Sequence, residues 1–378
     1  MSLRVTTVTT PRELWLLHDE WEQLFVRTQE TLPFLHPDWA LTWWDHFSVA
    51  RPLVRNGLYV KILRRESGEL VGVAPLMRTE RPAGGPLRVR SLDFLGADAY
   101  ITEERGALVD PDHAMEAGAA LARDLLNDRG WDWIAWHGLI RESDFVTGLE
   151  REMKLEWVGF QVANLLPLPS SWDAFKATLK RNIKESLRHC YNSLKRDGVT
   201  FRFDVAATTG DVDAALGTFF RLHAMRAAMS GTVVHPDHFA SARAQRFLRA
   251  VFARLAQKGI ARVFTIVIDG QAAAVRLGCM LPSCLYLYYS GYEPRWARYG
   301  IMTTAVAESI KYAIDHGVRL VHLSMGNDVS KARWGPDMPV YREATSVRPA
   351  LGSRAAHEAR RLMMALRRLT SSRPNNSV

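Results

Sequence analysis

Apolar and polar positions alternate most clearly in the second half of the chain, where they predict a β-hairpin. The run ARVFTIVIDGQAAAVRLGCML has apolar stretches on both sides of Asp269-Gly270, a pair that supplies the positive φ angles of a type I′ turn. The aromatic run CLYLYYSGY predicts a third strand over 284–292. The apolar spacing of IMTTAVAESIKYAIDHG then predicts a helix that stops at Gly317, and VRLVHLSMG predicts a fourth strand.

A short basic loop, PRWARYG (294–300), ends in glycine directly before the predicted helix. A helix N-terminus exposes backbone N–H groups and carries about half a positive charge. A glycine at that point lets a pyrophosphate come close to the backbone. The sequence therefore predicts a phosphate-binding site at the start of this helix.

The first half repeats this order of elements without repeating the residues. A hairpin over 58–78 turns at Ser67-Gly68, and a strand over 89–96, a helix over 113–130 and a strand over 131–139 follow. This recurrence predicts two copies of one fold, in domains 1–165 and 166–350. The first copy has PDHAMEAG where the second has its glycine loop. We therefore assign phosphate binding to the second copy alone.

Residues 170–197 predict one basic amphipathic helix that begins with a cap at Ser170 and stops at Gly198. A spacing of four residues places four cations on one face: Lys176, Lys180, Lys184 and Arg188. Two interpretations stay open. The stripe is either a solvated helix face or a cradle for an anionic substrate or for coenzyme A phosphates.

Length and composition narrow the classes of protein. At 378 residues, with 47% hydrophobic and 24% charged residues, the chain has the composition of a globular protein with room for two cores. No apolar run approaches the roughly 18 residues that a membrane span needs. The N-terminus lacks a signal-peptide core, and the three cysteines have no metal-like spacing, which favours a cytoplasmic protein. The pair His235 and His238 has no third ligand nearby, so we predict no metal site.

The net charge of +9 is concentrated in two segments. Residues 176–197 carry seven Lys or Arg against two acids, and residues 351–378 carry six Arg against one acid. Local patches of this kind indicate local functions rather than a surface for nucleic acid. The last segment predicts an amphipathic helix over 354–369 and disorder over 371–378. That helix either packs on the body or contacts an anionic membrane or a partner.

Two further groups are candidates for a site, and for each the alternative is a structural role. Trp39 and Trp43 share one helical face, which is typical of a core stripe or of the wall of a pocket. His223 and Arg226 share a face of a helix predicted over 211–229. A histidine has an unperturbed pKa near the working pH, so His223 is a candidate base.

Several short motifs in this order resemble the CelD/BcsL-type acetyltransferases, which are tandem members of the GNAT superfamily and are similar to Fem-type aminoacyltransferases. The motifs are Phe34-x-x-Pro37-x-Trp39 with Trp43-Trp44, Gly72-Val-Ala-Pro75-Leu76, Phe94-Leu95-Gly96 with Asp98-x-Tyr100, Leu222-His223-x-x-Arg226, and Gly326-x-Asp328-x-x-Lys331-x-x-Trp334. The resemblance covers residues 10–345. It implies an α/β chain of tandem acyl-CoA N-acyltransferase folds, each with a mixed sheet, and a degenerate first copy on the acceptor side.

The resemblance implies an acyltransferase that moves acetyl from acetyl-CoA to an amine or hydroxyl of a polysaccharide-related or cell-envelope acceptor. The acyl donor would contact Tyr289, Arg298, Tyr299, Gly300, Ile301, Met302 and Thr303. Catalysis would use His223 or Asp328 as base and Lys331 as an electrostatic clamp. The acceptor would contact Trp39, Trp43, Asp98, Tyr100, Arg226 and Trp334. The basic residue usual three positions before Gly300 is replaced by Ala297.

Two alternatives from other classes stay open. One is a Fem-like transferase that takes aminoacyl-tRNA on the stripe at 176–197, with binding that weakens steeply as salt rises. The other is a catalytically inactive scaffold protein of exopolysaccharide synthesis. The acceptor, the length of the acyl chain and the oligomeric state are not predicted by the sequence.

Overall fold

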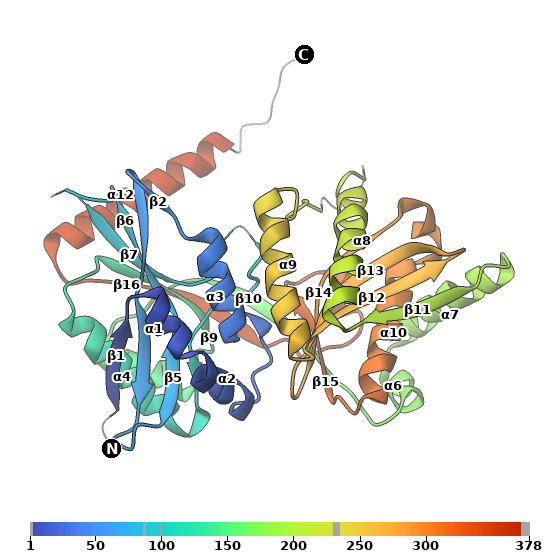
Figure 1. Ribbon diagram of the computed structural model, residues 1–378, viewed down its shortest axis with the longest axis horizontal. Helices are drawn as coiled ribbons and strands as arrows, with labels where there is room; N and C mark the ends of the chain where they lie inside the picture. Colours follow the sequence, from blue (N-terminus) through green and yellow to red (C-terminus); the bar gives the residue numbers. More distant parts are fainter. Residues whose placement is uncertain (1–2, 86–87, 99, 230–234, 372–378) are drawn as a thin grey trace, which may run out of the picture.

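The computed structural model describes residues 3–85, 88–98, 100–229 and 235–371. Helices and strands alternate along the chain, which confirms the predicted α/β class (Figure 1). The first half consists of β1 (Arg4–Val8), α1 (Pro11–Leu16), α2 (His18–Arg27), η1 (Pro33–Leu35), α3 (Pro37–Phe47), β2 (Ala50–Arg51), β3 (Val54–Leu58), β4 (Val60–Arg64), β5 (Leu70–Ala74), β6 (Leu76–Arg81), β7 (Val89–Phe94), β8 (Leu108–Val109), η2 (Pro111–His113), α4 (Ala114–Asn127), β9 (Trp133–Leu139), α5 (Asp144–Glu152) and β10 (Glu156–Pro167).

The second half consists of α6 (Trp172–Thr178), α7 (Arg181–Arg196), β11 (Phe201–Ala206), α8 (Thr209–Ala227), α9 (Ala242–Gln257), β12 (Ala261–Ile268), β13 (Gln271–Met280), β14 (Leu285–Tyr292), η3 (Pro294–Tyr299), α10 (Ile301–Asp315), β15 (Leu320–Met325), α11 (Val329–Ala332), β16 (Val340–Val347) and α12 (Leu351–Ser371). Among the described residues, no helix is both long and apolar enough to cross a bilayer. Residues 372–378 of the predicted disordered tail lie outside the described part, whereas Ser371 ends α12.

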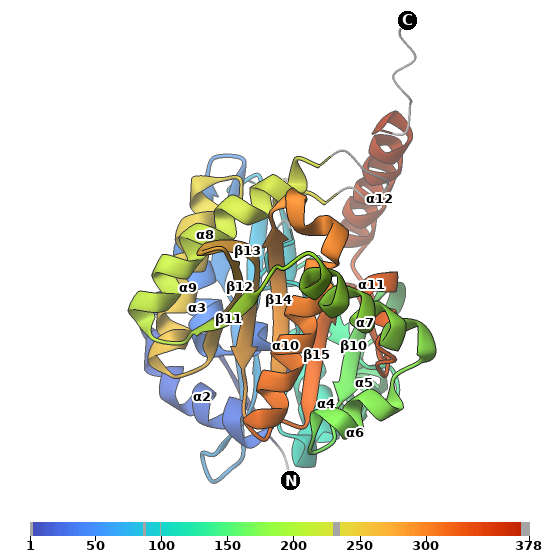
Figure 2. The same ribbon diagram turned by 90° about the vertical axis from the view of Figure 1, so that its right-hand side faces the viewer.

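One large mixed sheet runs through both halves. Its strand order is β11-β12-β13-β14-β15-β10-β16-β9-β7-β6-β3-β2, and a separate sheet of four strands, β1-β4-β5-β8, belongs to the first half. Strands β10 and β16 cross between the halves (Figures 1 and 2). The end of β10 pairs with β15, and its beginning pairs with β16, which pairs on its other side with β9. The predicted domain boundary after residue 165 falls inside β10 and stays a prediction.

Each half contains one parallel strand pair joined by a single crossover helix. In the first half β7 pairs with β9 and α4 connects them; in the second half β14 pairs with β15 and α10 connects them. A parallel pair requires such a crossover. The recurring order of elements predicted from the sequence is therefore present in the structure.

The predicted hairpins are confirmed at their turns. Asp269 and Gly270 have φ angles of 52° and 72°, so both central residues of the β12–β13 turn are left-handed, as a type I′ turn requires. The hairpin of β4 and β5 turns at Gly68, which has a φ of 91°.

One predicted helix is interrupted in the structure, so that prediction was wrong in detail. Residues 170–197 form α6 and α7, because Leu179 and Lys180 are extended, with ψ of 143° and 154°. The cap of α6 is Ser171, whose hydroxyl accepts from the N–H of Ala174, and not Ser170.

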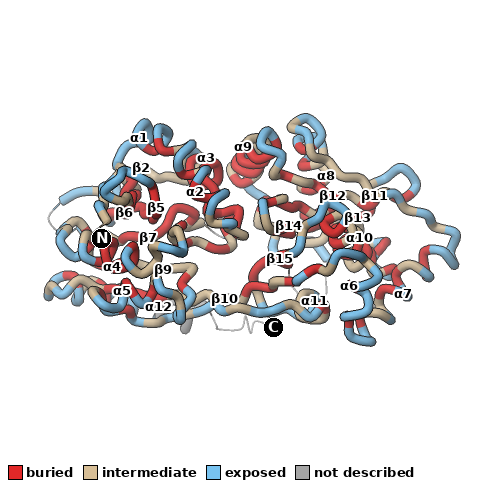
Figure 3. The backbone as a smooth tube through the Cα atoms, turned by 90° about the horizontal axis from the view of Figure 1, so that it is seen from below, coloured by how far each residue is buried: buried red, intermediate tan, exposed pale blue. Residues whose placement is uncertain are grey.

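The hydrophobic core holds the two halves together. Figure 3 shows buried segments in both halves, with α3 and α9 between them. One core cluster spans the halves: the rings of Trp39 and Phe247 lie 5.4 Å apart, and so do those of Phe34 and Tyr286. Burying a large apolar side chain contributes roughly 1.5–3 kcal/mol, so this cluster fixes the first half against β14.

Candidate active site

The parallel pair of β14 and β15 is short, and the two strands separate beyond it. Leu285 pairs with Val321 and Tyr286 with His322, and the pairing ends there. The opposite edge of β14 carries a β-bulge, because Tyr288 and Tyr289 together face one residue of β13. A bulge removes backbone groups from the regular ladder and redirects them. The opening therefore has backbone N–H groups of β14 on one side.

A loop from the first half reaches this opening and places a carboxylate in it. Glu103 accepts a hydrogen bond from the hydroxyl of Tyr286 on β14. It also accepts from Ser324 Oγ on β15, which lies 2.8 and 2.7 Å from its two oxygens. Glu103 thus bridges the two strands at the point where they separate. The next two tyrosines of β14 donate to backbone carbonyls of the same loop, Tyr288 to Ile101 and Tyr289 to Tyr100.

Burial and the charges around Glu103 have opposite effects on its pKa. Burial raises the pKa of Glu103 above its usual range, while the Tyr286 hydroxyl and the nearby cations Lys331 and Arg276 oppose this rise. Burial lowers the pKa of Arg276 to about 10, which leaves it charged at neutral pH. Burial and Lys331 lower the pKa of His322 to about 3, which leaves its ring neutral. The opening therefore combines a carboxylate of raised pKa with two fixed positive charges.

Three of the residues predicted to bind substrate instead hold the loop that carries Glu103. Asp98 accepts from the backbone N–H of Ile101 and of Thr102, at 2.7 and 3.0 Å. Trp43 donates from Nε1 to Asp98 at 2.8 Å, and Trp39 donates from Nε1 to Thr102 Oγ1 at 3.0 Å. Both tryptophans are buried and position this loop; Trp39 belongs to the core, whereas Trp43 also lines a pocket of the first half.

The same loop depends on a glycine. Gly96 has a φ of 96°, and a Cβ at this position would lie 2.6 Å from Thr102 Cγ2. Any other residue would both strain the backbone and push Thr102 away. The FLG motif of the sequence is therefore explained by the turn that returns the chain toward β14. Tyr100, also predicted to bind substrate, is exposed and has a positive φ of 76°.

His223 and Arg226 lie beside the bulge of β14, as their shared helix face predicted. His223 donates from Nδ1 to the carbonyl of Ser290 at 2.9 Å, so its neutral form has the lone pair on Nε2. Nε2 is buried, has no hydrogen-bond partner among the residues that the structure describes, and lies 3.8 Å from Asp237 Oδ1. Burial lowers the pKa of His223. Arg226 donates to Ser290 Oγ at 3.0 Å.

The turn after β15 places Lys331 against its own strand end. Lys331 Nζ lies 3.1 Å from Asp328 Oδ2 and donates to the carbonyl of Met325. Lys331 acts electrostatically on both Glu103 and His322, so it belongs to the opening. Trp334, in contrast, is buried in the core below α10, and we assign it to packing rather than to the acceptor.

At the predicted phosphate loop the backbone has the expected conformation, but α7 packs against it. Gly300 has a φ of 62° and caps α10. A Cβ at Gly300 would lie 2.7 Å from Cys190 Sγ of α7, so α7 covers one side of the helix start. Tyr299 is buried, with its hydroxyl donating to Asp197 at 3.0 Å and accepting from Arg298. The side chains of Arg298 and Tyr299 are therefore engaged with each other and with Asp197. The first turn of α10, Ile301–Thr303, begins where the sequence predicted a helix start.

Three of the four cations of the predicted stripe line one groove, although the helix is broken between α6 and α7. The groove has a volume of about 640 Å³, and Lys311 of α10 adds a cation to it. Its other cations are Lys176, Lys184 and Arg188, and its aromatic walls are Trp172 and Tyr191. Lys180, which was predicted to be in the stripe, lies in the break instead.

Sequence reasoning missed Glu103. The signal that could have found it is an acidic pair, Glu103-Glu104, directly after a motif of glycine and aspartate at the end of a strand. Nothing local shows that this loop reaches the other half, since its partners Tyr286 and Ser324 are 183 and 221 residues away.

Comparison with known proteins finds a family model that matches part of the second half. Residues 181–333 match the family model described as Acetyltransferase (GNAT) domain. No match to a curated protein was found. The chain is similar in fold to the crystal structure of FemX, with a TM-score of 0.57 and 14% identity over 90% of this chain and 96% of that chain.

Two further solved structures have similar folds. A conserved protein of unknown function from Bacteroides thetaiotaomicron has a TM-score of 0.52 and 10% identity over 90% of this chain and 100% of that chain. The C-terminal domain of a putative lysylphosphatidylglycerol synthetase from Agrobacterium fabrum has a TM-score of 0.50 and 13% identity over 93% and 96%. At identities of 10%, 13% and 14%, these likenesses show a similar fold and not a shared activity. The chain thus has a mixed α/β fold, and the part of it that matches the GNAT domain model, residues 181–333, carries the opening between β14 and β15.

Proposed function

We propose that this protein transfers an acyl group from an acyl-CoA thioester to an amine or hydroxyl of an acceptor. The observation that carries the proposal is the carboxylate of Glu103 at the opening of the parallel pair, between Tyr286 and Ser324. Acyl transfer needs a base for the proton of the nucleophile and donors aimed at the developing oxyanion. A partly buried carboxylate of raised pKa beside two cations supplies both kinds of group.

The proposed step assigns one task to each group. The acceptor nitrogen or oxygen attacks the thioester carbon and loses its proton to Glu103, which we propose as the base in place of His223 or Asp328. Backbone N–H groups at the bulge of β14 and Lys331 stabilise the oxyanion. The C–S bond then breaks, and the thiolate of coenzyme A leaves and takes up a proton. The first turn of α10 holds the pyrophosphate.

His223 then has a positioning role. Its bond to the carbonyl of Ser290 fixes the neighbouring strand, and its ring is enclosed by Phe219, Phe239 and Tyr289 at 5.2–5.6 Å. We further propose acetyl as the acyl group and a polysaccharide-related or cell-envelope acceptor, as the resemblance to CelD/BcsL-type acetyltransferases implies. We also propose a cytoplasmic location, which the three free cysteines favour.

A second candidate is a Fem-like transfer from aminoacyl-tRNA. Two observations favour it: Cys190 covers one side of the predicted pyrophosphate site, and the cationic groove beside it has aromatic walls. The fold likeness to FemX agrees with either candidate. A polyanion bound in the groove would lose affinity steeply as salt rises.

We expect acetyl-CoA, and not deacylated tRNA, to bind the full chain in calorimetric titrations. Met302→Glu should weaken acetyl-CoA binding by at least about tenfold, because it places a carboxylate in the first turn of α10 where phosphate is expected. Met302→Gln is the matched control, since it has the same shape without the charge. Salt-sensitive binding of tRNA alone would favour the Fem-like candidate, and binding of neither ligand would favour a scaffold protein.

A further inference from the structure

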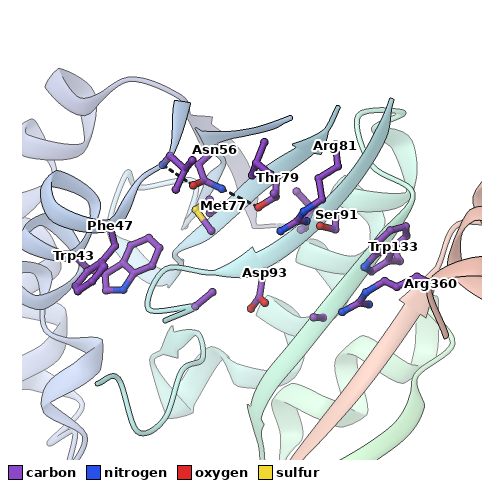
Figure 4. Close-up of a pocket in the computed structure, with 15 residues that line it drawn as sticks. Trp43, Phe47, Asn56, Met77, Thr79, Arg81, Ser91, Asp93, Trp133 and Arg360 are labelled. Carbon is purple, nitrogen blue, oxygen red and sulfur yellow. Dashed lines mark hydrogen bonds between the residues drawn. The ribbon is translucent and has the colours of Figure 1, made fainter. Parts of the chain in front are cut away.

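A second pocket lies in the first half, on one face of the large sheet. Asn56 of β3 pairs with Thr79 of β6, and Thr79 pairs with Ser91 of β7. Ser91 in turn pairs with Trp133 of β9. Paired residues of neighbouring strands point to the same face, so these four side chains form a row across the floor of the pocket. Figure 4 shows them across the strands, with Trp43 and Phe47 on one side and Arg360 beside Trp133 on the other.

The pocket lies at the first half's counterpart of the opening that Glu103 occupies. β7 and β9 pair in parallel only at Ser91 and Leu92, and they separate beyond these residues. Asp93 and Ala135, the first residues beyond the pairing, both line the pocket. Because none of the groups assigned to acyl transfer lines it, this is a site distinct from the candidate active site.

The pocket consists of two adjoining cavities of about 300 and 570 Å³. The two share Arg81, Ser91, Trp133 and Arg360, so these residues mark their junction. Their combined size accommodates a small organic ligand.

Two guanidinium groups line this junction, and no ion pair within 4 Å joins either of them to an acid of the described chain. Arg81 enters from β6 and Arg360 from α12 (Figure 4). Throughout the described chain, neither has a hydrogen bond or an ion pair with another residue; Arg360 instead lies over the ring of Trp133, 5.2 Å from its centroid. Burial and the charge of Arg360 lower the pKa of Arg81, and the charge of Asp93 opposes this. Arg81 is exposed and Arg360 is partly buried, and two like charges beside one cavity attract an anion that neutralises them.

The acid in the pocket acts on Arg81 without forming an ion pair with it, because its close partners are other cations. Among the described residues that line the two cavities, Asp93 is the acidic one, and its carboxylate is 2.9 Å from Arg105 and 3.5 Å from His137. The remaining walls are largely apolar or aromatic. Trp43 and Phe47 stand at the α3 end.

We propose that this double pocket binds an organic anion whose carboxylate or phosphate ester lies between Arg81 and Arg360. Guanidinium groups bind both kinds of anion in a bidentate manner, and two of them hold one group from two sides. The apolar part of the ligand packs on Trp133 and on the wall of Trp43 and Phe47. The proposal goes beyond acyl transfer, because it assigns the first half its own ligand.

The test is calorimetric titration of the full chain with phenyl phosphate, phenylacetate and benzyl alcohol. We expect one of the two anions to bind, and benzyl alcohol, which has a similar ring and no charge, to bind at least about tenfold more weakly. Tighter binding of phenyl phosphate assigns the site to a phosphate ester, and tighter binding of phenylacetate assigns it to a carboxylate.

Variants separate this pocket from general attraction by a basic protein. Arg81→Gln and Arg360→Gln should each weaken binding of the anion by about tenfold or more, as expected for a lost hydrogen bond to a charged group. Arg361→Gln is the control, because Arg361 lies on the same helix, pairs with Glu156 and does not line the pocket. Equal binding by Arg360→Gln and wild type, or no anion binding by the wild type, would overturn the proposal.

Discussion

Glu103→Gln is expected to lower the rate of acyl transfer by at least about a hundredfold, the effect usual for a lost general base. The substitution keeps the shape of the side chain, and the amide oxygen can still accept from Tyr286 or Ser324. The fold should therefore stay intact. The rate is measured as the release of coenzyme A thiol from acetyl-CoA with a panel of amine and hydroxyl acceptors.

The pH dependence gives a second readout of the same variant. A base must be ionised, so the rate of the wild type falls as pH falls through the pKa of Glu103. Because burial raises that pKa, the fall occurs at a higher pH than an exposed glutamate would give. We call this fall the acid limb of the pH–rate profile, and Glu103→Gln should lose it altogether.

The neighbouring glutamate is the matched control. Glu104 is buried, and burial raises its pKa to about 7, yet its surroundings include His137 and Arg105 of the first half and Glu343 of β16 rather than β14. Glu104→Gln should keep near-normal turnover. Equal losses in the two variants would assign the effect to loop stability and not to a base.

Lys331→Ala is expected to lower turnover by about a hundredfold, since a lost oxyanion donor costs roughly 3–4 kcal/mol. Its removal also takes away a positive charge that lowers the pKa of Glu103, so the acid limb should move to higher pH. Stability should change by about 1 kcal/mol or less, because the partner Asp328 is half exposed and can be solvated.

Lys258→Ala is the control for this variant. Lys258 also pairs with an acid, Glu22, and is similarly shielded, but it packs against α2 and α3 rather than at the end of β15. A normal rate and an unmoved acid limb in Lys331→Ala would make Lys331 an ordinary ion pair of the turn.

Local chemistry made much of the second half predictable. The turn at Asp269-Gly270 and the cap at Gly300 need positive φ angles, and residues that adopt them are visible in the sequence. The amphipathic spacing of residues 301–315 likewise reflects one buried face. The break at Leu179 and Lys180 was not predictable in this way, because both residues are compatible with a helix and the packing of α6 and α7 decides the conformation.

The site was less predictable because its parts come from both halves. Asp98, Trp39 and Trp43 were found as candidates, yet their hydrogen bonds go to the loop of Glu103 and not to a ligand. That role depends on how the first half packs against β14, and periodicity carries no information on such contacts. The same holds for Trp334, which packs in the core. The sequence pattern of a tryptophan after a turn is the same whether its side chain packs in the core or lines a cleft.

The most direct measurement is a crystal structure of the full chain with an unreactive thioether analogue of acetyl-CoA. We expect the pyrophosphate at the first turn of α10 and the acyl carbonyl at the bulge of β14, with Glu103 on the acceptor side within reach of one water molecule. An analogue bound away from the opening between β14 and β15, or with its acyl group remote from Glu103, would contradict the proposed acyl-transfer site.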